Sequence, residues 1–277
     1  MSQDLQKKAK DIPLDERSKH LRKSVIQCIE AGGRGHIGPA LSLIEIIRVL
    51  YDDFLVFDSK NTKLKSRDRF ILSKGHGCLA LYAVLADKDF FLKKELKTAC
   101  EPLSILGGHP EIKVPGVEAS TGALGHGLPI GVGMAIAAKI KKENHKVVVI
   151  IGDGETDEGS IWESAMSASK HKLSNLIVLL DYNKIQSYGF VKDVLDLEPL
   201  KQKWESFGFF VKEVNGHDVI QIKNTLKEVS GIEEKPKIII CHTIKGKGVN
   251  FAENDPHWHH KNNLGKKELE QLYNSLK

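Results

Sequence analysis

The chain has 277 residues, of which 41% are hydrophobic and 28% charged, and its formal net charge is +5. Disordered chains contain fewer apolar residues and carry a larger net charge, so this composition indicates a folded protein. The net charge is small, and basic residues are interspersed with acidic ones, which argues against nucleic-acid binding. The longest apolar run, residues 78–86, is far shorter than the ~20 residues of a membrane-spanning helix.

Segments with helical spacing of apolar residues alternate with short apolar runs along the chain. In chain order we expect helices over residues 41–56, 77–86, 128–140, 160–169 and 220–229, and strands over residues 69–72, 146–151, 176–180, 209–213 and 237–242. Runs such as VVVII and LIVLL are apolar throughout, as in strands covered on both faces. The sequence therefore predicts an α/β fold with a doubly wound, mainly parallel sheet, helices on both faces, and a ligand site beyond the carboxyl ends of the strands.

No linker, repeat or low-complexity segment divides the chain, so we expect residues 1–277 to form a single domain. The start, MSQDLQKKAK, mixes acids and bases without an apolar segment. This argues against a secretory signal or transit peptide and predicts a cytoplasmic protein. Cys28, Cys78, Cys100 and Cys241 show no CxxC spacing, and we expect them to be small buried hydrophobes.

The strongest chemical signal lies in residues 147–186, which read as strand, loop GDGETDEG, helix, strand and loop YNKIQ. In a parallel pair the two loops leave the same edge of the sheet, so Asp153 and Asn183 should lie side by side. A carboxylate, a carboxamide oxygen and a backbone carbonyl suit Mg²⁺, which completes its octahedron with phosphate oxygens and water. The sequence thus predicts a metal-bridged diphosphate.

Two other interpretations of this loop compete with a metal site. Gly152 and Gly154 begin a dinucleotide-binding pattern, but its third glycine is replaced by Asp157, and the acidic loop would repel a bare pyrophosphate. An acidic turn that merely caps a helix accounts for Glu155 and Asp157. It does not account for Asn183.

The GDG sequence at residues 152–154, followed at a distance by Asn183, resembles the thiamine diphosphate motif of the transketolase superfamily. Four further segments are similar to transketolase segments in the same order: GHIGPALS (35–42), SRDRFILSKGHG (66–77), GGHPE (107–111) and STGALGHGL (120–128). The resemblance spans residues 35–259. It implies the diphosphate-binding half of a thiamine diphosphate-binding fold and transfer of a two-carbon ketol unit between sugars.

The resemblance also implies roles for individual residues. It places the magnesium ligands at Asp153, Asn183 and the carbonyl of Ile185, and the cofactor contacts at His76, Gly122, Leu124, Gly154, Asn183, Ile185 and Ile244. Glu158 matches a family glutamate that sits at the subunit contact and relays protonation between sites. The alternative for Glu158 is a carboxylate that stabilises a helix N-terminus.

Histidines are numerous, with 12 in the chain, and His36, His76, His109 and His126 each adjoin a glycine. Such loops suggest a shared polar pocket, whereas the spacing matches no short zinc motif. The resemblance implies that His36, His76, His109 and His259 line the channel to the reactive carbon, where imidazole can donate or accept protons near neutral pH. His257 and His260 remain alternatives to His259, and His126 stands where many relatives have Gln. His20, His145, His171 and His217 are expected to be solvated.

In the family, a second domain supplies the glutamate that activates the cofactor and the arginines that hold sugar phosphates. This chain ends after the diphosphate-binding half, so the resemblance implies a partner subunit carrying that glutamate, with two copies of each chain. The alternatives are the α subunit of a 2-oxo acid dehydrogenase, a deoxyxylulose phosphate synthase-like enzyme, and a cofactor-binding remnant without turnover. The donor and acceptor sugars cannot be read from this half.

Overall fold

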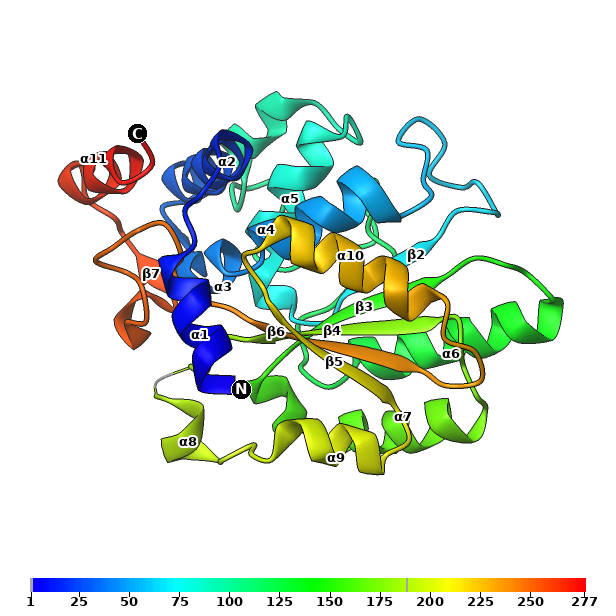
Figure 1. Cartoon of the computed structure of the whole chain (residues 1–277). Coiled ribbons are helices and arrows are strands. Elements are labelled where there is room, and N and C mark those ends of the chain that lie inside the picture. The colour runs from blue at the N-terminus through cyan, green and yellow to red at the C-terminus, as the bar shows by residue number, and fades with distance from the viewer. Residues whose placement is uncertain (1, 188) are drawn as a thin grey trace.

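The core of the protein is a sheet of five parallel strands, seen in a computed structural model that describes residues 2–187 and 189–277 (Figure 1). The strand order is β2 (Arg69–Leu72), β3 (Val147–Gly152), β4 (Leu176–Tyr182), β6 (Lys237–His242) and β5 (Phe210–Asn215). Each neighbouring pair is parallel. The predicted α/β fold class is confirmed, and each strand lies within about two residues of its expected bounds.

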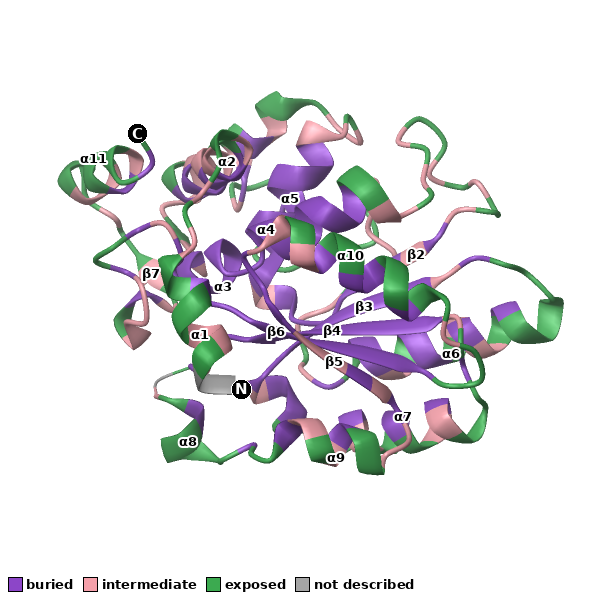
Figure 2. Ribbon diagram, in the orientation of Figure 1, coloured by how far each residue is buried: buried purple, intermediate pink, exposed green. Residues whose placement is uncertain are grey.

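Helices cover both faces of the sheet (Figure 1). One face packs against α4 (Ile44–Val49), α5 (Cys78–Asp87) and α10 (Val219–Ser230), and the other against α6 (Gly127–Lys141), α7 (Gly159–Lys170) and α9 (Leu200–Ser206). Alternate residues of a strand face opposite sides, so Val148 and Ile150 join the first core while Val147 and Val149 join the second. This is why the inner strands β3, β4 and β6 are buried along their length, whereas the edge strands β2 and β5 are buried only in part (Figure 2).

The helix expected over residues 41–56 is present as α4, which continues directly into a π-helical turn at Leu50–Phe54. It starts later than expected because a separate short helix, α3 (Ile37–Leu41), precedes it. The break between α3 and α4 falls at Ser42, whose hydroxyl donates to Asp181 Oδ2 at 2.7 Å and lies 3.0 Å from Pro39 O. The interruption therefore directs a buried hydroxyl toward the end of β4, a long-range requirement that apolar periodicity does not report.

Several elements were not predicted from the sequence. They are the helices α1 (Ser2–Asp11), α2 (Glu16–Gly32), α8 (Val191–Val194), α9 and α11 (Lys266–Asn274), short 3₁₀ turns at Gly75–Gly77, Lys93–Thr98, Gly154–Asp157 and Pro256–Trp258, and the two-stranded ribbon of β1 (Arg34–Gly35) and β7 (Lys261–Asn262). Helix α2 is capped at its N-terminus by Asp15, whose carboxylate accepts a hydrogen bond from Ser18 N, and at its C-terminus by Gly33 in a left-handed conformation. The ribbon pairs residues that adjoin His36 and His260. It therefore brings two distant histidine segments together.

Three of the four cysteines are buried, as expected. Cys28, Cys78 and Cys241 are buried and Cys100 is half-buried, and all four are free thiols. Among the described residues, no helix has both the length and the apolar character needed to cross a bilayer.

Candidate functional site

Asp153 and Asn183 lie together at the carboxyl edge of the sheet. The register of β3 and β4 places Gly152 opposite Asp181, so the loops that follow these residues leave the sheet side by side. The Oδ2 atom of Asp153 accepts a 2.6 Å hydrogen bond from the backbone N–H of Lys184, the residue after Asn183. The adjacency that parallel pairing requires is therefore present as a direct contact between the loops.

The oxygen atoms at this edge form a set that suits a hard cation. The amide of Asn183 donates to Asp181 Oδ2 at 3.2 Å, which orients its Oδ1 toward the N–H of Ile185 at 3.1 Å. The carbonyl oxygen of Ile185 already accepts from a cation, the ammonium of Lys245, at 2.8 Å. No three His, Cys, Asp or Glu side chains of the described residues converge as a metal site. With a single carboxylate, this set fits Mg²⁺ only if phosphate oxygens and water complete the shell.

Asp153 is almost fully buried, and this burial has an electrostatic consequence. Its Oδ1 accepts a 2.8 Å hydrogen bond from Gly154 N. Burial, with the nearby carboxylate of Asp181 second, raises the pKa of Asp153 to about 6 even though Lys245 and Lys74 oppose the shift. A cation at this position would lower that pKa and stabilise the ionised carboxylate. A bound cation would thus offset the cost of burying this carboxylate.

Asp181 and Lys74 form a buried ion pair behind the site, and neither was identified from the sequence. Asp181 accepts hydrogen bonds from Lys74, Thr243, Ser42 and Asn183. Burial by itself would raise the pKa of Asp181, but the Lys74 ammonium and the hydroxyl donors hold it below its ordinary value. Asp181 is therefore an ionised anchor that orients Asn183. The only sequence signal for it is an acid at the end of the apolar run LIVLL.

Glu155 is a structural carboxylate rather than a helix cap. It is 1% exposed and accepts hydrogen bonds from Ser73 Oγ, from Gly125 N at 2.9 Å and from Gly152 N at 3.1 Å. Ser73 follows β2, Gly125 precedes α6, and Gly152 is the last residue of β3. Glu155 therefore ties the loops around the site to one another, and the interpretation of this residue as a simple acidic turn is wrong.

A cavity of about 290 Å³ opens between these loops, and ten of the predicted site residues line it. They are His36, His76, His109, Gly122, Leu124, Asp153, Gly154, Asn183, Ile185 and His259. Lys74, Glu155, Gln186, Ser187 and Lys245 also line it and were not predicted. Residues from separate stretches of the chain thus converge on one polar cavity.

The backbone approaches closely at two glycines in this cavity. A Cβ atom on Gly122 would lie 3.2 Å from the ring of His109, and one on Gly154 would lie 3.0 Å from Cγ of Gln186. A side chain at either position would crowd a residue that lines the cavity, and glycine lets the main chain lie close to that residue instead. This is the arrangement that a ligand contacting main-chain atoms requires.

His36 lies at the centre of the histidine cluster. Its ring centroid is 5.4 Å from that of His76, 6.0 Å from His109 and 5.3 Å from His259. Burial, followed by the charges of His260 and His109, lowers the pKa of His36 to about 4, and burial likewise lowers the pKa values of His76, His109 and His259. The four rings are therefore neutral at pH 7 and can each donate one hydrogen bond and accept another.

The structure distinguishes among the histidines of the HWHH segment. His259 lines the cavity, and its Nδ1 is buried with no hydrogen-bond partner among the described residues. His260 lies 4.5 Å from His36, ring centroid to centroid, on an adjoining cavity of about 600 Å³. His257 is exposed and pairs with Asp255 at 2.8 Å. His126, also exposed, contacts the carbonyl of Leu124 and stands at the start of α6.

Two predicted site residues lie outside this cavity. Glu158 is exposed at the N-cap of α7, and its side chain rests against the backbone of Gly125. Ile244 is buried and lines a neighbouring cavity together with Ile185. Within this chain alone, Glu158 therefore reaches no other site residue that the structure describes, whereas Ile244 adjoins the site from behind.

The histidines expected to be solvated divide into two groups. His20 and His171 are exposed, as predicted. His145 and His217 are buried, so the prediction was wrong for them. His217 contacts a carboxylate in the core that is distant in sequence, at Glu45, and no local pattern reveals such a contact.

The family of the chain follows from comparison with known proteins. Residues 15–276 match the family model described as "Transketolase, thiamine diphosphate binding domain". The chain belongs to the transketolase family. The resemblance based on five motifs is thereby confirmed, and it extends over more of the chain than those motifs span.

Relatives in the transketolase family include single subunits of similar length. A subunit of the apulose-4-phosphate transketolase of Phocaeicola vulgatus is 42% identical over 247 residues, covering 89% of this chain and 88% of that one. The 6-deoxy-6-sulfo-D-fructose transketolase subunit SqwG of Clostridium sp. is 40% identical over 243 residues, covering 87% of this chain and 88% of that one. These relatives are named as subunits of transketolases, which are transferases.

The crystal structure of transketolase from Campylobacter jejuni superposes with a TM-score of 0.87 at 32% identity, covering 99% of this chain but 43% of that one. The chain thus spans less than half of that longer transketolase. It corresponds in extent to the subunit relatives instead.

Proposed function

We propose that residues 1–277 form a single diphosphate-binding domain that works as one subunit of a two-chain transketolase, transferring a two-carbon ketol unit from a ketose or ketose phosphate to an aldose. The observation that carries this proposal is the cavity in which a magnesium-type oxygen set adjoins four neutral histidines. Bound thiamine diphosphate supplies the nucleophilic carbon for this chemistry. A cytoplasmic location accompanies the proposal.

The residues divide the work between the two ends of the cavity. Asp153, Asn183 and the carbonyl of Ile185 would hold Mg²⁺ and, through it, the diphosphate, and Gly154 lines the same cavity. Gly122 and Leu124 would contact the aminopyrimidine ring, and Ile185 and Ile244 would pack on the cofactor rings. Lys245 adds a positive charge that would offset the diphosphate.

The histidines would act at the outer end of the cavity. His36, His76, His109 and His259 can orient sugar hydroxyls and move a proton to or from the oxygen of the substrate carbonyl, because neutral imidazole both donates and accepts. The unpartnered Nδ1 of His259 is a buried group that a bound ligand would satisfy. Magnesium would thus bind the diphosphate, whereas the histidines would contact the sugar.

A partner subunit would complete the site. We propose that it carries the activating glutamate, and that the assembly holds two copies of each chain with Glu158 at a contact between them. The exposure of Glu158 at the start of α7 is compatible with such a contact. The sugar substrates are proposed by class, as phosphorylated or otherwise anionic ketoses, because relatives are named for apulose 4-phosphate and a sulfofructose.

Co-expression with the product of the adjacent reading frame tests the proposal. We expect the two chains to purify together and, with thiamine diphosphate and Mg²⁺, to turn over a ketose phosphate. Either chain alone should be inactive. Turnover of pyruvate instead would support the 2-oxo acid dehydrogenase alternative, and tight cofactor binding without turnover of either substrate would support a remnant.

A pair of substitutions in one turn tests the metal site. Asp153→Asn removes the proposed carboxylate ligand and should weaken Mg²⁺-dependent binding of thiamine diphosphate by more than about 100-fold. The matched control is Asp157→Asn, since Asp157 is exposed and hydrogen-bonds to Gln186. Equal binding by the two variants would contradict the magnesium assignment.

A further inference from the structure

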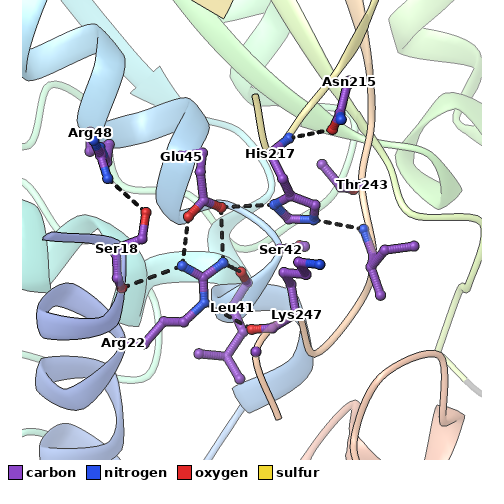
Figure 3. Close-up of polar contacts among 12 residues, drawn as sticks. Ser18, Arg22, Leu41, Ser42, Glu45, Arg48, Asn215, His217, Thr243 and Lys247 are labelled. Carbon is purple, nitrogen blue, oxygen red and sulfur yellow. Dashed lines mark hydrogen bonds and ion pairs between the residues drawn. The ribbon is translucent and has the colours of Figure 1, made fainter. Parts of the chain in front are cut away.

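A buried ionic cluster lies behind the cofactor cavity, centred on Glu45 in α4 (Figure 3). Glu45 is 1% exposed and accepts hydrogen bonds from Arg22 Nη1 at 2.6 Å and Nη2 at 2.9 Å. Its Oε2 also lies 2.8 Å from Nδ1 of His217. None of these three side chains lines the cavity. Their role must therefore be sought in the main-chain segments to which they hydrogen-bond.

The hydrogen bonds of His217 determine its tautomer. Its Nε2 accepts a 2.9 Å hydrogen bond from the backbone N–H of Ile244, and an atom that accepts cannot also carry a proton. The Nδ1 atom therefore bears the proton and donates it to Glu45. The backbone of the 215–217 turn is held by Asn215, whose Oδ1 accepts a hydrogen bond from His217 N at 3.0 Å. The ring thus transmits the position of Glu45 to the main chain of Ile244.

Arg22 holds the same loop at its other end. Its Nε donates to the carbonyl of Lys247 at 2.8 Å, while its two terminal nitrogens grip Glu45. The main chain is therefore fastened at Ile244 and at Lys247. Between these two points lies Lys245, whose ammonium reaches the carbonyl of Ile185 in the cavity.

We propose that Arg22, Glu45 and His217 are positioning residues, which set the 244–247 loop so that Ile244 and Lys245 are correctly placed for the cofactor. This inference rests on the proposed function, because it assumes that the cavity takes thiamine diphosphate. The decisive contact is the acceptor atom Nε2 of His217. Burial alone would not require it, since the Glu45 carboxylate is already paired with Arg22.

Two conservative substitutions separate positioning from packing. His217→Gln keeps an acceptor near the place of Nε2 but loses the donor to Glu45, whereas His217→Asn keeps a donor near Nδ1 and loses the acceptor. Both remove one hydrogen bond of the ring and should lower the unfolding midpoint similarly. Only the Asn variant leaves the N–H of Ile244 unpaired.

Amide hydrogen exchange on the full chain gives a readout that needs no cofactor. We expect the Ile244 amide to exchange at least about tenfold faster in His217→Asn than in His217→Gln, as loss of one buried hydrogen bond predicts. The Ile239 amide in β6 should exchange alike in both variants. In the assembly with the partner subunit, the Kd for thiamine diphosphate with Mg²⁺ should rise about tenfold in the Asn variant and much less in the Gln variant.

The outcomes distinguish this inference from the function on which it rests. If the wild-type assembly binds the cofactor but the two variants show the same Kd, or the same Ile244 exchange rate, the positioning role is overturned. If the wild-type assembly fails to bind thiamine diphosphate, the proposed function is overturned and this inference with it.

Discussion

The ammonium of Lys245 lies 2.8 Å from the carbonyl oxygen of Ile185 and joins the loop after β6 to the loop after β4. Lys245 is 1% exposed. Burial and the neighbouring charge of Lys74 lower its pKa to about 7, against the opposing effect of Asp153 and Asp181. An anion bound in the cavity would stabilise the charged form of the Lys245 ammonium.

Replacement of Lys245 should therefore weaken cofactor binding. Lys245→Met removes the ammonium while keeping the length of the side chain, and we expect the affinity for thiamine diphosphate to fall roughly tenfold or more, as for loss of a charge-assisted hydrogen bond. Titration calorimetry on the two-chain assembly measures this. The exposed Lys94 provides the control variant Lys94→Met, and equal affinities of the two variants would show that Lys245 does not contact the diphosphate.

His36 should affect turnover rather than cofactor affinity. Its ring is central to the cluster and neutral, so His36→Asn should lower kcat for a ketose phosphate by about 10²–10⁴, the usual contribution of a positioned acid or base. Steady-state kinetics and cofactor titration together check this. His171→Asn, at an exposed position, should leave both unchanged. A fall in cofactor affinity equal to the fall in kcat would assign His36 to the cofactor instead.

Arg22 and Glu45 should show strong energetic coupling. Arg22→Met leaves the buried Glu45 carboxylate without its main partner, and we expect the free energy of unfolding to fall by about 3–5 kcal/mol. The double variant Arg22→Met/Glu45→Met should lose less than the sum of the single variants, which urea denaturation measures. The exposed pair Lys172 and Glu234 is the control, and Lys172→Met should change little. Additive losses for Arg22 and Glu45 would contradict coupling.

Lys237 should make the free energy of unfolding depend on pH above about pH 8. Burial lowers its pKa from 10.5 to about 8, while its ammonium bonds to the carbonyl of Ser174. Between about pH 8 and 10.5, Lys237 is protonated in the unfolded chain but largely neutral in the folded protein, so its contribution to stability rises with pH across that window. Below that window, the cost of burying the charged ammonium opposes folding.

The corresponding variant tests the sign. Lys237→Met should be more stable than wild type at pH 7, by on the order of 1 kcal/mol, and the difference should shrink as pH approaches 10. Urea unfolding at pH 7 and pH 10 measures both quantities. Lys235→Met, at an exposed neighbouring position, should show neither effect. A variant less stable than wild type at pH 7 would contradict the burial cost.

The sequence indicated the strands and the long helices around the sheet because their apolar residues repeat with a period set by local backbone geometry. It also indicated that Asp153 and Asn183 would meet, because parallel pairing brings the ends of adjacent strands to one edge. This edge accounts for Asp153, Gly154, Asn183 and Ile185 among the ten candidate residues that line the cavity. Helix α2 and the β1–β7 ribbon were missed, since a mixed helix and a two-residue strand leave weak periodic signals.

Only the tertiary structure placed the charges that support the site. Asp181, Lys74, Lys245 and the pair of Glu45 with His217 are polar residues inside the protein, and each is stable there because a partner distant in sequence supplies the opposite charge or the missing hydrogen bond. Local sequence patterns indicate helices and strands through the spacing of apolar residues, and turns through the residues that favour them. The identity of a distant partner depends instead on how the whole chain packs. The motifs therefore determined which cofactor and fold to expect, and the packing decided which side chains hold the site in place.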